Sequence, residues 1–291
     1  MAAENNLTEK FAKAQSIDFV EQFGKSIKKL LEMLKIERRM TLPVGATIKT
    51  YSSKVTLDGT KVAKGDIIPL SKVETTEGDP IELAWDKKRK AVAIEDIQAY
   101  GFEQAVSKTD TELLRELQKE IKKNFFAQLA KGTTSVSGVG LQVAMAKAWG
   151  GVAGKFEDDD VTTIAFVNPT DVADYLATAQ ITVQTAFGLR YVENFLGVDV
   201  AIMSTSVPAK TLYATASDNL CLAQANMAGS EIAKAFDFTT DETGIIGVTH
   251  DVNKQRLTAE TVTASATVLF AERLDGIVKA TITEAAAAAK A

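Results

Sequence analysis

The chain has 291 residues, of which 46% are hydrophobic and 24% charged, and its mean hydropathy is +0.00. These values are typical of a globular protein and exclude a disordered or fibrous one. Cys221 is the only cysteine and His250 the only histidine, so internal disulfides, cysteine clusters and histidine-rich metal cages are excluded.

The net charge of −5 is unevenly distributed along the chain. Residues 1–40 contain eight basic and six acidic residues, whereas residues 133–250 contain five basic and 13 acidic ones. A protein that grips nucleic acid needs a basic face, so strong DNA binding is not expected. The polar start and the lack of an apolar run of about 18 residues predict a chain that is made in the cytoplasm.

Residues 7–36 have apolar side chains at three- and four-residue steps, which predicts an amphipathic helix. The apolar stripe consists of Leu7, Phe11, Ile17, Val20, Phe23, Ile27, Leu30, Leu31 and Leu34. Gly24 marks an expected bend, because glycine costs about 1 kcal/mol in a helix interior. Two interpretations fit this pattern: an arm that docks on another subunit, and a helix that packs on its own domain.

Residues 43–95 are rich in strand-forming residues, and Asp58-Gly59 predicts a two-residue hairpin turn between residues 55–57 and 60–62. Polar residues occupy both faces of this predicted ribbon, so neither face can close a core of its own. Because an isolated two-stranded ribbon is marginal in water, we expect another surface to support it, such as a neighbouring subunit.

Residues 109–131 form the clearest predicted helix. Residues 109–112 (TDTE) fit a capping box, and an apolar face follows from Leu113 to Leu129. Gly132 is the predicted carboxy-terminal cap. At 1.5 Å per residue the helix would be roughly 30 Å long.

The rest of the chain alternates helix and strand. Strands are predicted at 161–167, 198–203, 211–214, 257–271 and 277–282, and helices at 140–149 and from 168 to about 179. In the segment 257–271, the predicted apolar face consists of Val262, Ala264, Ala266, Val268 and Phe270.

Motifs for catalysis or ligand binding are weak. Residues 150–156 (GGVAGKF) fail the Walker spacing, which needs a glycine at Trp149 and a hydroxyl residue at Phe156. The contiguous acids 157–160 lack the alternating ligands of a calcium loop and are interpreted as a solvated loop. No nucleophile is tied to the pair His250-Asp251, which we expect to cap a turn or to lie on a strand edge.

Four further features have structural interpretations. We expect Cys221 to be a small buried hydrophobe, Trp85 and Trp149 to pack rather than stack on bases, and the basic run 87–90 to form a solvated turn. The sequence therefore predicts no catalytic, cofactor-binding or metal-binding residues, no cofactor and no enzyme.

The order of the predicted parts resembles the major capsid proteins of tailed double-stranded DNA phages, whose fold, often called the Johnson fold, is shared with encapsulins. Local stretches are also similar to that family. They are residues 166–170 (FVNPT), 196–200 (LGVDV) with 206–209 (SVPA), and 270–276 (FAERLDG). The resemblance extends over roughly residues 20–283.

The resemblance implies an α+β capsid fold with an amino-terminal arm, an extended β-hairpin loop, a peripheral domain around a long spine helix, and an axial α/β domain. The implied boundaries are 1–42 for the helical arm, 43–95 for the extended loop, 96–132 with 251–283 for the peripheral domain, 133–250 for the axial domain and 284–291 for the tail.

The implied function is a shell subunit in the virion, assembling into pentamers and hexamers around double-stranded DNA, with a separate scaffolding protein and a portal as partners. No membrane partner is expected. The implied subunit-interface residues are Lys54, Asp58, Gly59, Lys61, Lys64, Asp66 and Trp85. An encapsulin-like compartment and a soluble α/β enzyme that uses His250 or the acidic cluster are the alternatives.

Some members of the family join subunits through a Lys–Asn isopeptide bond that a glutamate promotes. Lys54, Lys61 and Lys64 lie in the corresponding loop, and Asn253 is the nearest asparagine by segment. We expect no such crosslink in this chain.

Overall fold

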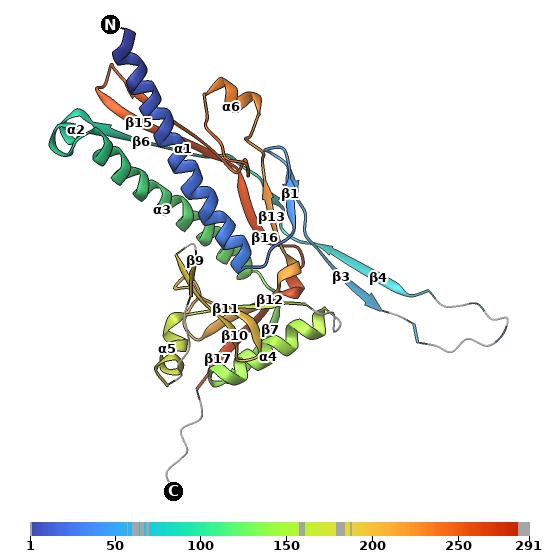
Figure 1. Cartoon of the computed structure of the whole chain (residues 1–291). Helices are drawn as coiled ribbons and strands as arrows, with labels where there is room; N and C mark the ends of the chain where they lie inside the picture. The colour runs from blue at the N-terminus through green and yellow to red at the C-terminus, as the bar shows by residue number, and fades with distance from the viewer. Residues whose placement is uncertain are drawn as a thin grey trace.

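The computed structural model describes residues 2–56, 58, 59, 64, 67, 70–156, 161–178, 184–186 and 188–284, with side chains except those of 2–11, 51–55, 174–178 and 186. Helices and several sheets are mixed in it, which confirms the predicted α+β class (Figure 1). The helices are α1 (Ala2–Met33), α2 (Ile94–Tyr100), α3 (Phe102–Leu129), α4 (Gly140–Lys155), α5 (Pro169–Thr178) and α6 (Glu231–Ala235).

A seven-stranded sheet forms the lower part of the molecule in Figure 1. Its order is β7 (Thr134–Val139), β17 (Val278–Thr283), β12 (Thr211–Ala216), β8 (Thr163–Val167), β11 (Val198–Met203), β10 (Leu189–Phe195) and β9 (Gln184–Ala186). All five residues of β8 are buried, as its β-branched composition predicts for a central strand. Asn168 then accepts a hydrogen bond from the Thr170 amide at 2.9 Å, which starts α5 where the sequence predicted a helix.

The described residues form four smaller sheets as well. One joins β1 (Arg39–Thr41), β13 (Leu220–Gln224) and β16 (Thr267–Ala271), and another joins β14 (Ile246–Asn253), β15 (Thr258–Ser265) and β6 (Asp86–Ala93). The two ribbons pair β2 (Thr47–Ile48) with β5 (Ile81–Glu82) and β3 (Tyr51–Thr56) with β4 (Lys72–Glu77).

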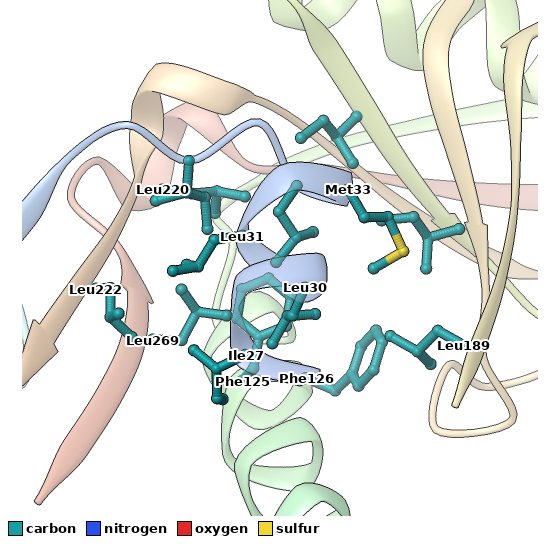
Figure 2. Close-up of a cluster of buried hydrophobic side chains, with 14 of the residues drawn as sticks. Ile27, Leu30, Leu31, Met33, Phe125, Phe126, Leu189, Leu220, Leu222 and Leu269 are labelled. Carbon is teal, nitrogen blue, oxygen red and sulfur yellow. The ribbon is translucent and has the colours of Figure 1, made fainter. Parts of the chain in front are cut away.

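Helix α1 packs on its own chain. Its carboxy-terminal half contributes Phe23, Ile27 and Leu30 to the main hydrophobic core. Figure 2 shows Ile27 and Leu30 beside Phe125 and Phe126 of α3. The interpretation as an arm that docks on another subunit is therefore wrong for this half of the helix. Gly24 does not interrupt this helix, which is continuous from Ala2 to Met33.

Helix α3 begins earlier than the sequence predicts. It starts at Phe102, so Thr109 lies inside the helix and donates to the carbonyl of Ala105 at 3.0 Å instead of capping the end. The predicted carboxy-terminal cap is also wrong, because α3 ends at Leu129. Gly132 instead lies against Ile277, whose Cγ2 would be 2.7 Å from a β-carbon at this glycine.

The basic run 87–90 is part of strand β6 and not a turn. Its side chains alternate between the two faces of the sheet, and Lys88 and Lys90 face α3, where they pair with Glu120 and Asp110. The hydrogen bonds from Lys88 to Glu120 and Asp86 raise the pKa of Lys88 to about 12.

Both faces of β15 are buried in its second half, and the predicted apolar face is confirmed at Ala264. Ala259, Thr261 and Thr263 are buried, whereas Val262 is only half-buried. On the face that was not predicted to be buried, Thr261 Oγ1 donates to Asp110 Oδ1 of α3 at 3.1 Å. Further along, Ala266 and Phe270 are buried as predicted.

The strand pairing crosses the boundaries that the resemblance implies. β6, from the predicted extended loop, pairs with β15, and β17 joins the seven-stranded sheet. Among the described residues of the segment 43–95, the ribbon β3–β4 stands apart from the body of the molecule (Figure 1).

Candidate subunit interface

The ribbon β3–β4 projects from the body of the molecule (Figure 1). Thr56 pairs with Lys72 and Tyr51 with Glu77, so the connection runs from residue 57 to residue 71. The predicted two-residue turn at Asp58-Gly59 is therefore wrong. All six residues of β4 are exposed, so this strand contributes nothing to a core of its own chain.

The base of the ribbon is fixed to the body by polar contacts. The Gly78 amide donates to the Thr50 carbonyl at 2.7 Å, and Lys49 pairs with Glu77 at 2.6 Å. Asp79 pairs with Lys131, just after α3, at 3.2 Å. These contacts hold the base in place while the strands beyond it extend into solvent.

Aliphatic side chains are exposed at the outer part of this hairpin. Ile67 is 94% exposed, Leu70 96% and Val73 59%. Neighbouring apolar residues in an exposed ribbon are a feature of protein interfaces. The predicted interface list omitted these three residues, and the apolar stretch 67–70 (IIPL) was the sequence signal for Ile67 and Leu70.

Four of the predicted interface residues lie on the hairpin in the described part of the chain. Lys54 is opposite Glu74 in the register of the ribbon. Asp58 and Gly59 are exposed, the Asp58 amide reaches Ser71 Oγ at 3.3 Å, and Lys64 is exposed.

The other three predicted interface residues are not described as exposed residues of the hairpin. Lys61 and Asp66 lie outside the described residues, as does the acidic stretch 157–160. Trp85 is half-buried and packs on its own chain against the small cluster of Leu83, Ala225 and Ala266. The interface predicted from sequence therefore reduces to the hairpin itself.

His250 lies on β14 with 4% of its side chain exposed, within a buried polar cluster. Its Nε2 is 3.0 Å from Asp110 Oδ2, and its Nδ1 is 2.8 Å from Ser16 Oγ on α1. Asp110 Oδ1 also accepts from Lys90 Nζ at 2.7 Å and from Thr261 Oγ1 at 3.1 Å. The cluster joins α1, α3, β6, β14 and β15. His250 lies on β14, the edge strand of its three-stranded sheet, so of the two predicted positions the strand edge is confirmed and the turn cap is wrong.

Burial and charge oppose each other in this cluster. Burial disfavours the Asp110 carboxylate, but hydrogen bonds from His250 and Lys90 outweigh it, and the pKa of Asp110 is lowered. Burial also lowers the pKa of Lys90, although Asp110 favours its charged form. Both residues keep each other charged in a site that is nearly closed to water.

The remaining candidates for chemistry have structural surroundings. Cys221 is fully buried beside Phe270, as predicted, and burial raises the pKa of its thiol. Residues 150–155, part of the failed Walker match, belong to helix α4. Trp149 on the same helix is 48% exposed, so the prediction that it packs is wrong for about half of its side chain. In the described part of the chain, no group of three or more His, Cys, Asp and Glu side chains is placed to hold a metal ion.

Asn253 is held by local contacts. Its Nδ2 donates to Glu260 Oε1 at 3.2 Å, and its Oδ1 accepts from the amides of Gln255 and Arg256. Arg89 donates two hydrogen bonds to Glu260, and this interaction lowers the pKa of the Glu260 carboxyl. This glutamate is therefore a weak proton acceptor.

Comparison of the structure with solved structures identifies the fold. The encapsulin of the holo-SrpI complex from Synechococcus elongatus has a TM-score of 0.55 at 11% identity, over 88% of this chain and 90% of the encapsulin. The capsid protein of cyanophage P-SCSP1u has a TM-score of 0.54 at 11% identity, over 85% and 86%. This chain has the tailed-phage capsid fold.

The capsid fold extends over nearly the whole chain. A virus-like particle protein from Pyrococcus furiosus matches 90% of this chain and 99% of its own length, with a TM-score of 0.50 at 10% identity. No family model matches the sequence, and a search of curated proteins found no match. The fold predicted from the resemblance is confirmed, although sequence similarity to these proteins is very low.

No helix in the described residues combines the length and the apolar character that a membrane crossing requires.

Proposed function

We propose that this chain is the major capsid protein of a tailed double-stranded DNA phage, a structural subunit that self-assembles into an icosahedral shell around the genome. The hairpin β3–β4 carries the proposal. It is a ribbon with exposed apolar side chains that is fixed to its own chain at the base, on a fold found in capsid and virus-like particle structures. Such a ribbon is stable only against another surface, and a second copy of the chain provides one.

The proposed contact is heterologous: the hairpin of one copy binds a surface of the next copy that is not that copy's own hairpin. Repeated contacts of this kind close into rings and, through curvature, into shells. We assign the seven-stranded sheet with α4 and α5 to the axial domain, and α3 with the β6–β15–β14 sheet to the peripheral domain. Pentamers and hexamers in the virion, a separate scaffolding protein, a portal and synthesis in the host cytoplasm complete the proposal. The role is structural and not enzymatic.

Assembly of the purified chain tests the proposal. We expect large particles in sedimentation velocity and electron microscopy, and a doubly substituted hairpin (Ile67→Asp with Leu70→Asp) that stays folded by circular dichroism but does not assemble. Ile17→Asp, which changes an exposed isoleucine on α1, is the matched control and should still assemble. A wild-type chain that stays monomeric even with scaffold present contradicts the proposal.

An encapsulin-like compartment is the second candidate, because an encapsulin and a phage capsid protein are equally similar to this chain, at TM-scores of 0.55 and 0.54. The content of the particles separates the two functions. Packaged double-stranded DNA in particles from infected cells supports the phage capsid, whereas a co-purified enzyme cargo supports the compartment.

A further inference from the structure

The amino-terminal part of α1 is held on the body by a different kind of contact from the rest of the helix. From Phe19 onwards, α1 contributes a row of buried apolar side chains to the main core. Between residues 12 and 18, Ser16 is the only buried residue, and Ile17 is 43% exposed. Gln15 Oε1 is buried but has no hydrogen-bond partner among the described residues, which costs free energy. Docking of this part of α1 therefore depends mainly on the contact that Ser16 makes.

Ser16 contacts the ring of His250 on β14. Its Oγ is 2.8 Å from His250 Nδ1 and donates to the carbonyl of Ala12 at 3.0 Å. A serine hydroxyl has one proton, so it satisfies both neighbours only when His250 Nδ1 carries a proton of its own and donates it to Ser16 Oγ. When Nδ1 is unprotonated, it accepts the single hydroxyl proton, and the bond to Ala12 is lost.

The other ring nitrogen is fixed by Asp110. His250 Nε2 is 3.0 Å from Asp110 Oδ2, and an ionised carboxylate only accepts hydrogen bonds, so Nε2 carries a proton. In the described part of the chain, the charged groups of this cluster are Asp110 of α3 and Lys90 of β6, while β15 contributes the uncharged Thr261. Asp110 favours a charged ring and Lys90 opposes it. Asp110 contacts the ring directly, whereas Lys90 lies at the other carboxylate oxygen, so the effect of Asp110 is the larger one.

We propose that His250 is a proton-dependent switch in the docking of α1. With both nitrogens protonated, the ring donates to Asp110 and to Ser16 and so connects α3 to α1 through β14. Loss of the Nδ1 proton removes the charge-assisted bond to Ser16 and the bond from Ser16 to Ala12. The docked state thus binds the second proton, and docking weakens as the pH rises through the loss of that proton. The apolar part of α1 from Phe19 onwards stays docked in both states.

Nuclear magnetic resonance reports the ring directly, because His250 is the only histidine. In the unassembled subunit with ¹⁵N-labelled histidine, we expect both ring nitrogens to be protonated at about pH 5.5 and Nδ1 to lose its proton by about pH 8. Ser16→Ala should lower the pH of this transition by about one unit, since a hydrogen bond from a charged donor is lost. Ser26→Ala is the matched control on α1 and should leave the transition in place, because Ser26 Oγ accepts from Gln118 Nε2 at 3.0 Å and neither side chain titrates. An Nδ1 that is unprotonated over this whole range, or a transition that Ser16→Ala does not move, overturns the proposal.

Hydrogen exchange measures how tightly α1 is held. Exchange rates divided by the intrinsic rates at each pH give the opening equilibrium of the amides of residues 12–18. In the wild type we expect this equilibrium to rise about tenfold from about pH 5.5 to about pH 8, because a charge-assisted hydrogen bond is lost. In His250→Gln, whose side chain does not titrate, the rise should disappear, and the amides of residues 27–33 should be unaffected by pH in both proteins. A wild type without this rise, or the same rise in His250→Gln, overturns the proposal. Both measurements use the unassembled subunit, so their outcome is independent of the proposed shell function.

Discussion

Replacement of Asp110 by alanine should destabilise the subunit strongly, although Asp110 is remote from the proposed interfaces. Its carboxylate has three partners, Lys90, His250 and Thr261, at 2.7 to 3.1 Å. Asp110→Ala leaves an ammonium group whose side chain is only 15% exposed without its counter-charge. Breaking a buried ion pair on one side costs about 3–5 kcal/mol, and we expect about 3 kcal/mol here because the site retains slight exposure.

Urea unfolding of the unassembled subunit measures this loss. Glu112→Ala is the matched control on the same helix, because Glu112 pairs with Arg115 on the surface at 2.9 Å and both side chains are mostly exposed. That change should alter the free energy of unfolding by less than about 0.5 kcal/mol. A loss below about 1 kcal/mol for Asp110→Ala would refute the reasoning, since it would mean that the cluster is neither closed nor charged.

The pH dependence has a defined sign. The pKa of Asp110 is lower in the folded chain than in the unfolded one, so its stabilisation is present above the unfolded value of about 3.9. This stabilisation is lost as the pH falls through the folded value. The difference in stability between wild type and Asp110→Ala should therefore become smaller as the pH falls below about 4.

Two further predictions concern α1 and crosslinking. Leu30→Ala should lower the free energy of unfolding in urea by about 2–5 kcal/mol, because Leu30 is buried in the main core of its own chain. Lys28→Ala, at an exposed position nearby on α1, should lower it by less than about 0.5 kcal/mol. Equal effects of the two substitutions would mean that α1 does not pack on its own chain at Leu30. Assembled particles boiled in denaturant should give a single band near 31.2 kDa, since Glu260 is a weak proton acceptor beside Asn253. A ladder of covalent multimers would contradict this prediction.

The elements that were predicted well are those whose signal is local. Strand β8 follows from five consecutive apolar or β-branched residues, and the start of α5 follows from the Asn-Pro step at residues 168–169. The order of such elements was also sufficient for the resemblance to the capsid fold. In the candidate interface, the polar character of the ribbon could be predicted from the sequence, because this property depends on amino-acid composition alone.

The errors share one physical cause, which is dependence on distant partners. Thr109 looked like a helix cap because its sequence neighbours fit a capping box, but tertiary packing continues the helix back to Phe102. Apolar content did not predict that the second face of β15 is also buried, where Thr261 donates to Asp110, 151 residues away in the chain.

The amino-acid sequence by itself determined the class of fold, the positions of most helices and strands, and the polar ribbon, since periodicity and composition act over a few residues. Only the tertiary structure decided that α1 joins its own core, that His250 meets Asp110 and Ser16, and that Trp149 on α4 stays half-exposed. The contacts of His250 join residues that are 140 or more positions apart in the chain. Whether a side chain is buried depends on which distant segments pack against it, and the residue type alone does not determine it.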